Sequence, residues 1–400
     1  MRLKDLDVWV VGNPPPHFGG RYFIFLRLRT ECGIEGVGEV YTATFGPEVV
    51  RSMIEDVFAR YFLDVSPFEI EATWRRVYGS GYTMRPDMSL ISVLSGLEIA
   101  CWDIIGKATE QPVHALLGGR VHERLRTYTY VYPDASQDES MYHDVQATAE
   151  RALHYVDQGF TAIKFDPMDP YTVFDGRQPS LTELSRAERF VTTLRKAVGD
   201  RADLLFGTHG QFTPSGALRL AKRIESADPL WFEEPVPPDY PEGMAQVARQ
   251  THIPVATGER LCTKYEFARV LETNAASILQ MALGRVGGLM EGKKIAGMAE
   301  THHALIAPHL YCGPIEGAAN AQLAACTPNF LILESIERWE NFHADILVKS
   351  MQWEQGYLVV PTEPGLGVEL NVEVAEAHPY TGDALHLEMT PSYNPPTIPA

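Results

Sequence analysis

The sequence lacks the motifs that identify several large enzyme classes. It contains no G-x-S-x-G, no P-loop and no H-E-x-x-H, so nothing in it indicates a serine hydrolase, a P-loop nucleotide-binding enzyme or a zinc protease. Cysteine is scarce: five residues in 400, none in C-x-x-C spacing, predict reduced thiols and no disulfide framework. The first apolar run ends at Val11, which is too short for a signal-peptide core or a membrane span, and we expect a cytoplasmic protein.

Positive charge is also in short supply. The chain has 34 Lys and Arg residues but 52 Asp and Glu residues, and the resulting net charge of −18 is spread along the chain. A surface of this sign disfavours binding to nucleic acid or to an anionic membrane. We expect the partners to be a small-molecule substrate and further copies of the same chain in a homo-oligomer. With 45% hydrophobic residues, the chain is long enough for two domains or for a large α/β barrel with additions.

Residues 1–125 predict an α+β domain, because strands come first and helices afterwards. The strands are expected at 8–11, 22–28 and 34–40, and the helices at about 48–61, 67–78 and 88–109. The Pro- and Gly-rich segment 13–20 between the first two strands predicts a loop. We interpret this loop as a candidate lid.

Residues 126–345 alternate short apolar strands with helix-length segments. The strands are expected at 127–132, 162–165, 204–206, 230–232, 255–256, 277–280, 305–307 and 331–333. Eight such units close into an α/β barrel of the TIM type. Capping-box patterns at 180–183 and 263–266 support the positions of two helices. Residues 346–400 leave this pattern, and we expect them to pack back on the first domain.

Acidic residues end two successive strands of the predicted barrel. Glu233 and Glu234 precede Pro235, which ends one strand, and Glu259 ends the next. Because a parallel barrel gathers the C-terminal ends of its strands on one face, these acids are expected to converge there. We predict that Glu233 points inward and binds Mg²⁺ together with Glu259, and that Glu234 forms a supporting salt bridge. The alternative is that all three are helix-capping or surface acids.

Two histidines follow strands on opposite sides of the same face. His209 comes just after the third strand and His309 just after the seventh, where imidazoles can exchange protons near neutral pH. A structural role is the alternative for each. Glu334 ends the eighth strand and is expected to orient a substrate hydroxyl or hold a histidine, or else to pair with Arg338. Lys164 closes the second strand, where it either balances the carboxylates or acts as a base.

Several segments carry a family resemblance. They are QTHIPVATGER (250–260), ILQ (278–280), GGL (287–289), KIAGMAE (294–300), APH (307–309) and PGLG (364–367). Together they resemble the mandelate racemase branch of the enolase superfamily, nearest to acid-sugar dehydratases of the galactonate and mannonate type. The resemblance covers nearly the whole chain.

The resemblance implies a modified (β/α)7β barrel, capped by residues 1–125 and the C-terminal segment, with Mg²⁺ at the strand ends. In this family a base removes the proton α to a carboxylate and the metal stabilises the enediolate. Dehydratases then expel the neighbouring hydroxyl with help from an acid. By this resemblance the metal ligands are Glu233 and Glu259, the base is His309, the acid is His209, and the substrate-positioning residue is Glu334.

Two positions depart from the family pattern. Gly207 stands where a third-strand aspartate ligand is usual, and Ala282 replaces the aspartate that pairs with the seventh-strand histidine. Glycine has no ligand atom, and alanine cannot orient an imidazole. The replacement for the missing metal ligand is left open among His209, Gln211 and a water molecule.

The sequence therefore predicts a magnesium-dependent hydro-lyase that acts on a sugar-derived hydroxy acid. A racemase or epimerase is the first alternative, because it shares the initial proton abstraction and Lys164 opposite His309 would supply its second base. A metal-poor barrel that binds an acid sugar without turnover is the second alternative, and Gly207 and Ala282 support it.

Overall fold

The N-terminal part of the molecule begins with an antiparallel sheet. The computed structural model describes residues 1–134, 137, 139–168, 171–389 and 391. The sheet has the order β1-β2-β3, with β1 (Leu3–Gly12), β2 (Tyr22–Thr30) and β3 (Glu35–Val40). All three predicted strands are confirmed. β1 and β2 run longer than the sequence pattern indicated because they pair along their whole length, from Leu3 opposite Thr30 to Gly12 opposite Tyr22.

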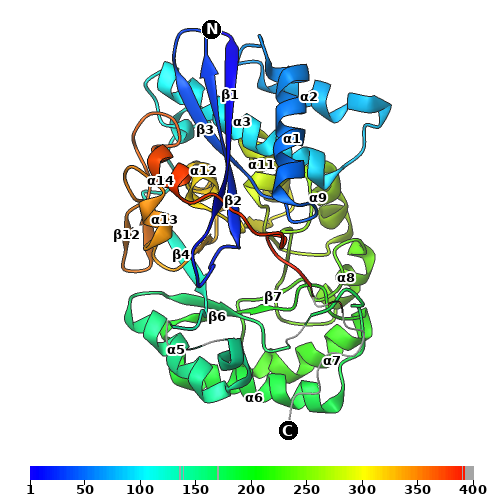
Figure 1. Ribbon diagram of the computed structural model, residues 1–400. Coiled ribbons are helices and arrows are strands. Elements are labelled where there is room, and N and C mark those ends of the chain that lie inside the picture. Colours follow the sequence, from blue (N-terminus) through cyan, green and yellow to red (C-terminus); the bar gives the residue numbers. More distant parts are fainter. Residues whose placement is uncertain (135–136, 138, 169–170, 390, 392–400) are drawn as a thin grey trace.

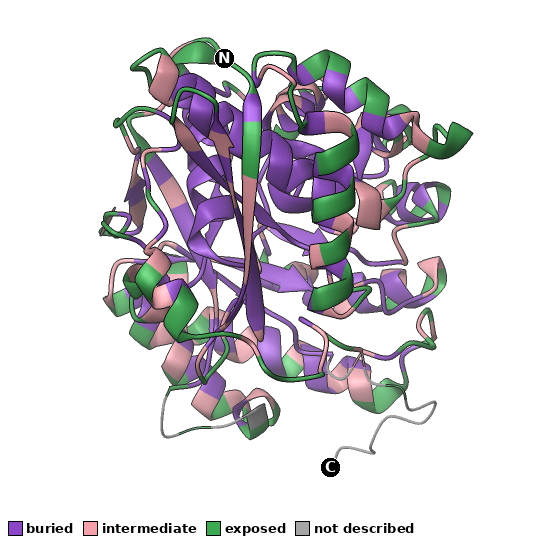
Figure 2. Cartoon of the chain, turned by 45° about the horizontal axis from the view of Figure 1, so that its top comes forward, coloured by how far each residue is buried: buried purple, intermediate pink, exposed green. Residues whose placement is uncertain are grey.

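A long helix, α3, joins this sheet to the rest of the molecule. The helical elements after the sheet are α1 (Pro47–Val57), a π-helical turn (Phe58–Phe62), α2 (Ile70–Tyr78), a 3-10 turn (Ser80–Tyr82), α3 (Met88–Ala108) and α4 (Val113–Leu116). By length and composition α3 could cross a membrane, but 83% of its most apolar window is buried. It packs against β3 at a close distance, since a Cβ on Gly38 would lie 2.0 Å from the backbone oxygen of Gly96. Helix α3 therefore belongs to the core. Figure 2 shows the buried residues of the molecule in purple.

Eight parallel strands form the second part of the molecule. They are β4 (Arg124–Tyr130), β5 (Ala162–Phe165), β6 (Asp203–Gly207), β7 (Trp231–Glu233), β8 (Val255–Thr257), β9 (Ile278–Leu279), β10 (Leu305–Ile306) and β11 (Leu333–Ser335). They pair in chain order from β4 to β10, and β11 pairs with β4. A bridge between Ile306 and Phe330 connects β10 to the segment before β11. All eight predicted strands are present, in the order that a closed barrel requires.

Helices connect the barrel strands. They are α5 (Val145–Asp157), α6 (Leu181–Val198), α7 (Pro214–Ile224), α8 (Pro241–Ala248), α9 (Thr263–Thr273), α10 (Leu283–Val286), α11 (Gly288–Thr301) and α12 (Pro314–Ala325), and α13 (Phe342–Asp345) follows the last strand, β11. The predicted capping box is confirmed at Ser180, where the side chains of Ser180 and Glu183 bond each other's backbone N–H. The box predicted at 263–266 is wrong, because α9 begins at Thr263 itself. Only Glu266 keeps its half of the motif, accepting from the Cys262 N–H at 2.7 Å.

The C-terminal segment contacts both parts of the molecule. Its elements are β12 (Trp353–Glu354), β13 (Tyr357–Val359) and α14 (Val372–Ala377). β13 pairs antiparallel with β4 of the barrel. After α14 the backbone bridges to β1, and the segment then runs past the ends of β1 and β2, in red in Figure 1. The end of the described chain thus lies beside the first domain's sheet.

Each barrel strand, or the residue next to it, contributes one side chain to a layer inside the barrel. This layer consists of Tyr128, Ala162, Leu205, Trp231, Ala256, Ile278, Ala307 and Ile332. Because strand side chains alternate with a period of two, residues two positions further along point into the same interior, nearer the C-terminal ends of the strands. That next layer contains the candidate site.

Candidate active site

The second interior layer is polar, in contrast to the apolar layer beneath it. Its members, two residues beyond those of the apolar layer, include Tyr130, Lys164, Gly207, Glu233, Gln280, His309 and Glu334. All but Tyr130 are buried. Glu259, which follows β8, is also buried and joins them. The structure therefore brings together five of the six predicted site residues around one point, and the sixth, His209, flanks them from the loop after β6.

Lys164 lies at the centre of this layer. Its Nζ is 2.5 Å from Glu233 Oε1, 3.6 Å from Glu334 Oε1 and 3.9 Å from Glu259 Oε2. Burial by itself would lower the pKa of Lys164, but the charges of Glu233 and Glu334 outweigh burial and raise it well above its usual value. Lys164 is therefore an ammonium ion at neutral pH, and it balances the carboxylates.

Both carboxylate oxygens of Glu233 accept hydrogen bonds from nitrogen donors. Oε1 accepts from Lys164, while Oε2 accepts from Trp231 Nε1 at 3.0 Å and from Gln280 Nε2 at 2.7 Å. Glu233 is 1% exposed. This residue points inward as predicted, so the alternative of a surface acid is wrong for it.

Glu234 and Glu259, the other two acids at these strand ends, lie in different environments. Glu234 forms the predicted salt bridge, with Arg260 NH2 2.6 Å from its Oε2. Glu259 Oε2 is buried and makes no hydrogen bond within the described part of the chain. Burial would raise the pKa of Glu259, but the charges of His209 and Lys164 outweigh burial and lower it. Glu259 is therefore an anion that faces the centre of the site.

His209 is held by Asp166, at the end of β5. Its Nδ1 lies 3.1 Å from Asp166 Oδ2, and because a carboxylate accepts, Nδ1 carries the hydrogen. Burial alone would lower the pKa of His209, but the hydrogen bond to Asp166 and the charge of Glu259 raise it above 6.5. Tyr171 stacks on the ring at 4.7 Å between centroids. This environment favours the protonated imidazole.

His309 has the opposite environment. Its Nε2 lies 3.4 Å from Glu259 Oε2, but its buried Nδ1 has no hydrogen-bond partner among the residues that the structure describes. Burial, followed by the charges of Lys164 and Arg285, lowers the pKa of His309 well below its usual value. Tyr41 of the first domain stacks on the ring at 5.9 Å between centroids. His309 is therefore a neutral imidazole at neutral pH.

Glu334 also faces the site. Its Oε2 accepts from the backbone N–H of Leu310 at 2.9 Å. Burial raises the pKa of Glu334 to about 7, although the charge of Lys164 opposes the shift. The alternative pairing with Arg338 is wrong, because Arg338 binds Glu340 at 2.6 Å.

The residues of this layer do not fit a magnesium ion as they lie. Mg²⁺ prefers oxygen ligands, yet the third strand offers Gly207 where an aspartate would stand. Lys164 already occupies the space between the carboxylates, and both oxygens of Glu233 are engaged by N–H donors. Within the described ranges, no group of three or more His, Cys, Asp or Glu residues could hold a metal ion. His209, one of the candidate substitute ligands, uses Nδ1 for Asp166.

A cavity of about 460 Å³ lies at the mouth of the barrel beside the His209 side of the site. Asp166 and Tyr171 line it from the barrel. Residues 16, 17, 20 and 21 line it from the first domain, and residues 386–388 line it from the C-terminal segment. The predicted lid loop thus forms part of the wall. Sequence reasoning missed Tyr41 and Arg285 near His309, and His386 in the cavity wall, because contacts between distant segments leave no local pattern.

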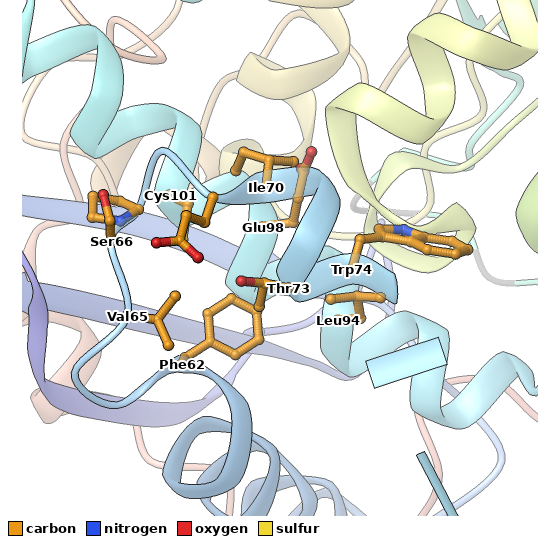
Figure 3. Close-up of a pocket in the computed structure, with 11 residues that line it drawn as sticks. Phe62, Val65, Ser66, Ile70, Thr73, Trp74, Leu94, Glu98 and Cys101 are labelled. Carbon is orange, nitrogen blue, oxygen red and sulfur yellow. The ribbon is translucent and has the colours of Figure 1, made fainter. Parts of the chain in front are cut away.

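A second cavity, shown in Figure 3, has no part in this site. It lies between α2, α3 and the loop before α2, and its volume is about 10 Å³. This is space for one water molecule at most, so we regard it as a packing void.

The comparisons with known proteins agree with the resemblance seen in the sequence. Residues 18–118 match the mandelate racemase / muconate lactonizing enzyme N-terminal domain family, and residues 147–374 match the enolase C-terminal domain-like family. A provisionally assigned mandelate racemase/muconate lactonizing enzyme from Labrenzia alexandrii DFL-11 is 63% identical, with a TM-score of 0.95, over 98% of this chain and 100% of that one.

Two curated relatives carry the names of dehydratases. D-xylonate dehydratase of Haloferax volcanii is 32% identical over 96% of this chain and 90% of its own length. D-gluconate/D-galactonate dehydratase of Picrophilus torridus is 32% identical over 95% of both chains. The similarity thus extends through both domains.

Proposed function

Because the chain belongs to the mandelate racemase/muconate lactonizing enzyme family of the enolase superfamily, we propose that it is a hydro-lyase that removes water from a sugar-derived hydroxy acid. The observation that carries this proposal is the pair of histidines at one barrel mouth whose pKa values are shifted in opposite directions. An acid and a base that coexist at one pH are what such a reaction needs.

The two histidines divide the chemistry between them. Neutral His309 takes the proton from the carbon next to the substrate carboxylate, which leaves an enediolate. His209, protonated at Nε2 and held through Nδ1 by Asp166, gives its proton to the neighbouring hydroxyl as the carbon–oxygen bond breaks. The products of this step are water and an enol, and the enol tautomerises to a 2-keto acid. Glu334, close to half protonated at neutral pH, is suited to hydrogen bond a substrate hydroxyl.

Magnesium is the cofactor that the family implies, and it would stabilise the enediolate charge. Glu233 and Glu259 are the residues that would hold it. The residues do not fit the ion as they lie, so no step of the proposed reaction is assigned to it.

The racemase alternative receives less support from the geometry. It needs a second base on the other substrate face, and Lys164 was the candidate. A lysine held 2.5 Å from Glu233 Oε1 with a raised pKa is a poor proton acceptor at neutral pH.

We place the reaction in the cytoplasm, with a small carboxylate as substrate and a homo-oligomer as the working form. The names of the relatives suggest aldonic acids such as D-xylonate, D-gluconate and D-galactonate for a first screen.

The proposal is tested by screening an acid-sugar library for loss of water and then separating the two proton transfers. In D₂O, His209→Asn should still exchange deuterium into the substrate α-position but should not form the keto acid. His309→Asn should lose both exchange and dehydration. His302→Asn, at an exposed residue after α11, serves as the matched control and should behave as wild type.

Exchange that persists in His309→Asn would contradict the assignment of the base. A wild-type protein that binds acid sugars but neither exchanges nor dehydrates any of them would favour the binding protein without turnover.

A further inference from the structure

We infer that the ammonium group of Lys164 is the resident cation of this active site and stands in the place of a divalent metal ion. The inference deepens the proposed function, on which it rests only for the identity of the site. It names the class of ligand that the site takes: a small organic carboxylate bound by an ammonium group without a bridging metal.

The position of Lys164 is the first argument. Its Nζ lies within 4 Å of three carboxylates, from Glu233, Glu334 and Glu259. The residue is 2% exposed, so little solvent screens these charges. A divalent ion at the same point would meet an ammonium group at contact distance, and the repulsion between two buried cations would be strong.

Gly207 supplies the second, independent argument. A Cβ at this position would lie 3.4 Å from Lys164 Cε and 3.9 Å from His209 Cε1, so a carboxylate there would point at the lysine. With glycine at this position, the third strand has no oxygen ligand beside Lys164.

Charge balance agrees with this exchange. Three carboxylates around a divalent ion carry one net negative charge, and so do Glu233 and Glu259 around the single charge of Lys164. The loss of the third-strand carboxylate and the replacement of a double by a single positive charge thus compensate each other.

The hydrogens of the ammonium group indicate what it binds. One N–H points to Glu233 at hydrogen-bond distance, whereas the separations of 3.6 and 3.9 Å to Glu334 and Glu259 exceed that distance. Two N–H groups thus remain to bind the oxygens of a substrate carboxylate. The same contacts would strengthen as negative charge grows on those oxygens in an enediolate.

The experiment measures divalent-ion binding directly. The wild-type protein, dialysed against EDTA, is titrated with MgCl₂ and MnCl₂ by calorimetry and by thermal unfolding. We expect no binding heat up to 1 mM and no change in melting temperature. The variant Lys164→Met should unfold at lower temperature and should now be stabilised by Mn²⁺ or Mg²⁺, because uncompensated carboxylates remain.

Adding the missing ligand extends the test. In the double variant Lys164→Met/Gly207→Asp we expect at least tenfold tighter Mn²⁺ binding than in Lys164→Met. Lys107→Met is the matched control, since Lys107 also pairs with a buried carboxylate, Asp103, at 2.7 Å but in the first domain. It should lower the melting temperature without creating divalent-ion binding.

Binding of one Mg²⁺ per wild-type chain with a submillimolar Kd, lost in Glu259→Gln, would overturn the inference. The titration of the wild-type protein tests the inference even if Lys164→Met does not fold. The failure of the proposed function would give a different result from the failure of this inference. If the protein turns over no acid sugar, with or without Mg²⁺, only the proposed dehydratase activity is rejected. Dehydration that EDTA abolishes and Mg²⁺ restores rejects the inference alone.

Discussion

The two histidines of the barrel mouth differ in the partner of Nδ1. Asp166 accepts a hydrogen bond from His209 Nδ1, whereas Nδ1 of His309 is buried without a partner among the described residues. A carboxylate partner stabilises an imidazolium, and burial without one destabilises it. At the scale of residues, this contrast assigns the acid and the base.

Asp166→Asn should weaken the acid. The amide keeps the shape of the side chain but removes the negative charge that raises the pKa of His209. We expect that pKa to fall. Since His209 must be protonated to act, the basic limb of the pH–kcat profile should move to lower pH, while the acidic limb, governed by His309, should not move. Movement of the acidic limb instead would show that Asp166 acts on the base.

At the scale of elements, the loop between β1 and β2 is built to meet the C-terminal segment. Asn13 Nδ2 donates to the carbonyls of Phe18 and Gly20, at 2.9 and 2.7 Å, which fixes the loop's shape. The ring of Phe18 stacks on Tyr132, just beyond the end of β4, at 4.2 Å. His386 packs against Gly20, and its ring nitrogens lie 2.9 Å from Tyr22 O and 2.8 Å from Tyr311 O. The loop thus joins the barrel, the first domain and the chain's end.

Gly20→Ala should disrupt the contact between the loop that joins β1 to β2 and the C-terminal segment. Gly20 has φ +109°, and a Cβ there would lie 1.9 Å from His386 Cε1, so the ring would have to leave. We expect faster hydrogen exchange in residues 381–389 and turnover of the proposed reaction lower on the order of tenfold. Gly33→Ala is the matched control: Gly33 also has positive φ (+86°), but nothing lies within 4 Å of its Cβ position. Equal effects of the two substitutions would mean that backbone strain, and not the contact with His386, is responsible.

At the scale of the whole molecule, buried acids of the first domain attach it to the barrel. Glu39 in β3 accepts from the backbone N–H groups of Gly313 and Glu316 at the start of α12. Glu98 in α3 accepts from those of Leu289 and Met290 at the start of α11. Carboxyl oxygens suit the N–H groups that have no partner within the first turn of a helix. The two domains therefore meet at helix N-termini.

This interface should make stability depend on pH. Burial, followed by the charge of Glu316, raises the pKa of Glu39 to about 8 from its usual 4.5. Below about pH 4.5 the side chain is protonated in both folded and unfolded chains. Between that pH and about 8 only the unfolded chain releases the proton, so the contribution of Glu39 to the free energy of unfolding falls as pH rises.

Urea unfolding of wild type and Glu39→Gln at pH 5 and pH 8 measures this contribution. We expect a smaller loss of stability between the two pH values in the variant, because glutamine does not titrate. Glu123→Gln, at a side chain that is 85% exposed, is the control and should keep the wild-type pH dependence. Parallel pH dependences in wild type and Glu39→Gln would reject the prediction.

The sequence by itself determined the order and type of the elements. Apolar runs and period-two alternation specify where strands lie, so all three sheet strands and all eight barrel strands could be predicted. The same alternation predicted that Glu233 points inward and Glu234 outward to a salt bridge. The rules are local, because a strand's side chains alternate whatever it packs against. The domain boundaries at 125 and 345 and the roles of the site residues stay predictions.

Tertiary structure decided the contacts between distant parts of the chain. Whether Lys164 balances carboxylates or acts as a base depended on three acids from other strands, and their distances are set only when the barrel closes. The stacking of Tyr41 on His309, the packing of His386 on Gly20 and the capping of α12 by Glu39 join segments far apart in the chain. Charge and burial at such points are sums over neighbours that no local pattern encodes, and this is why the sequence left them open.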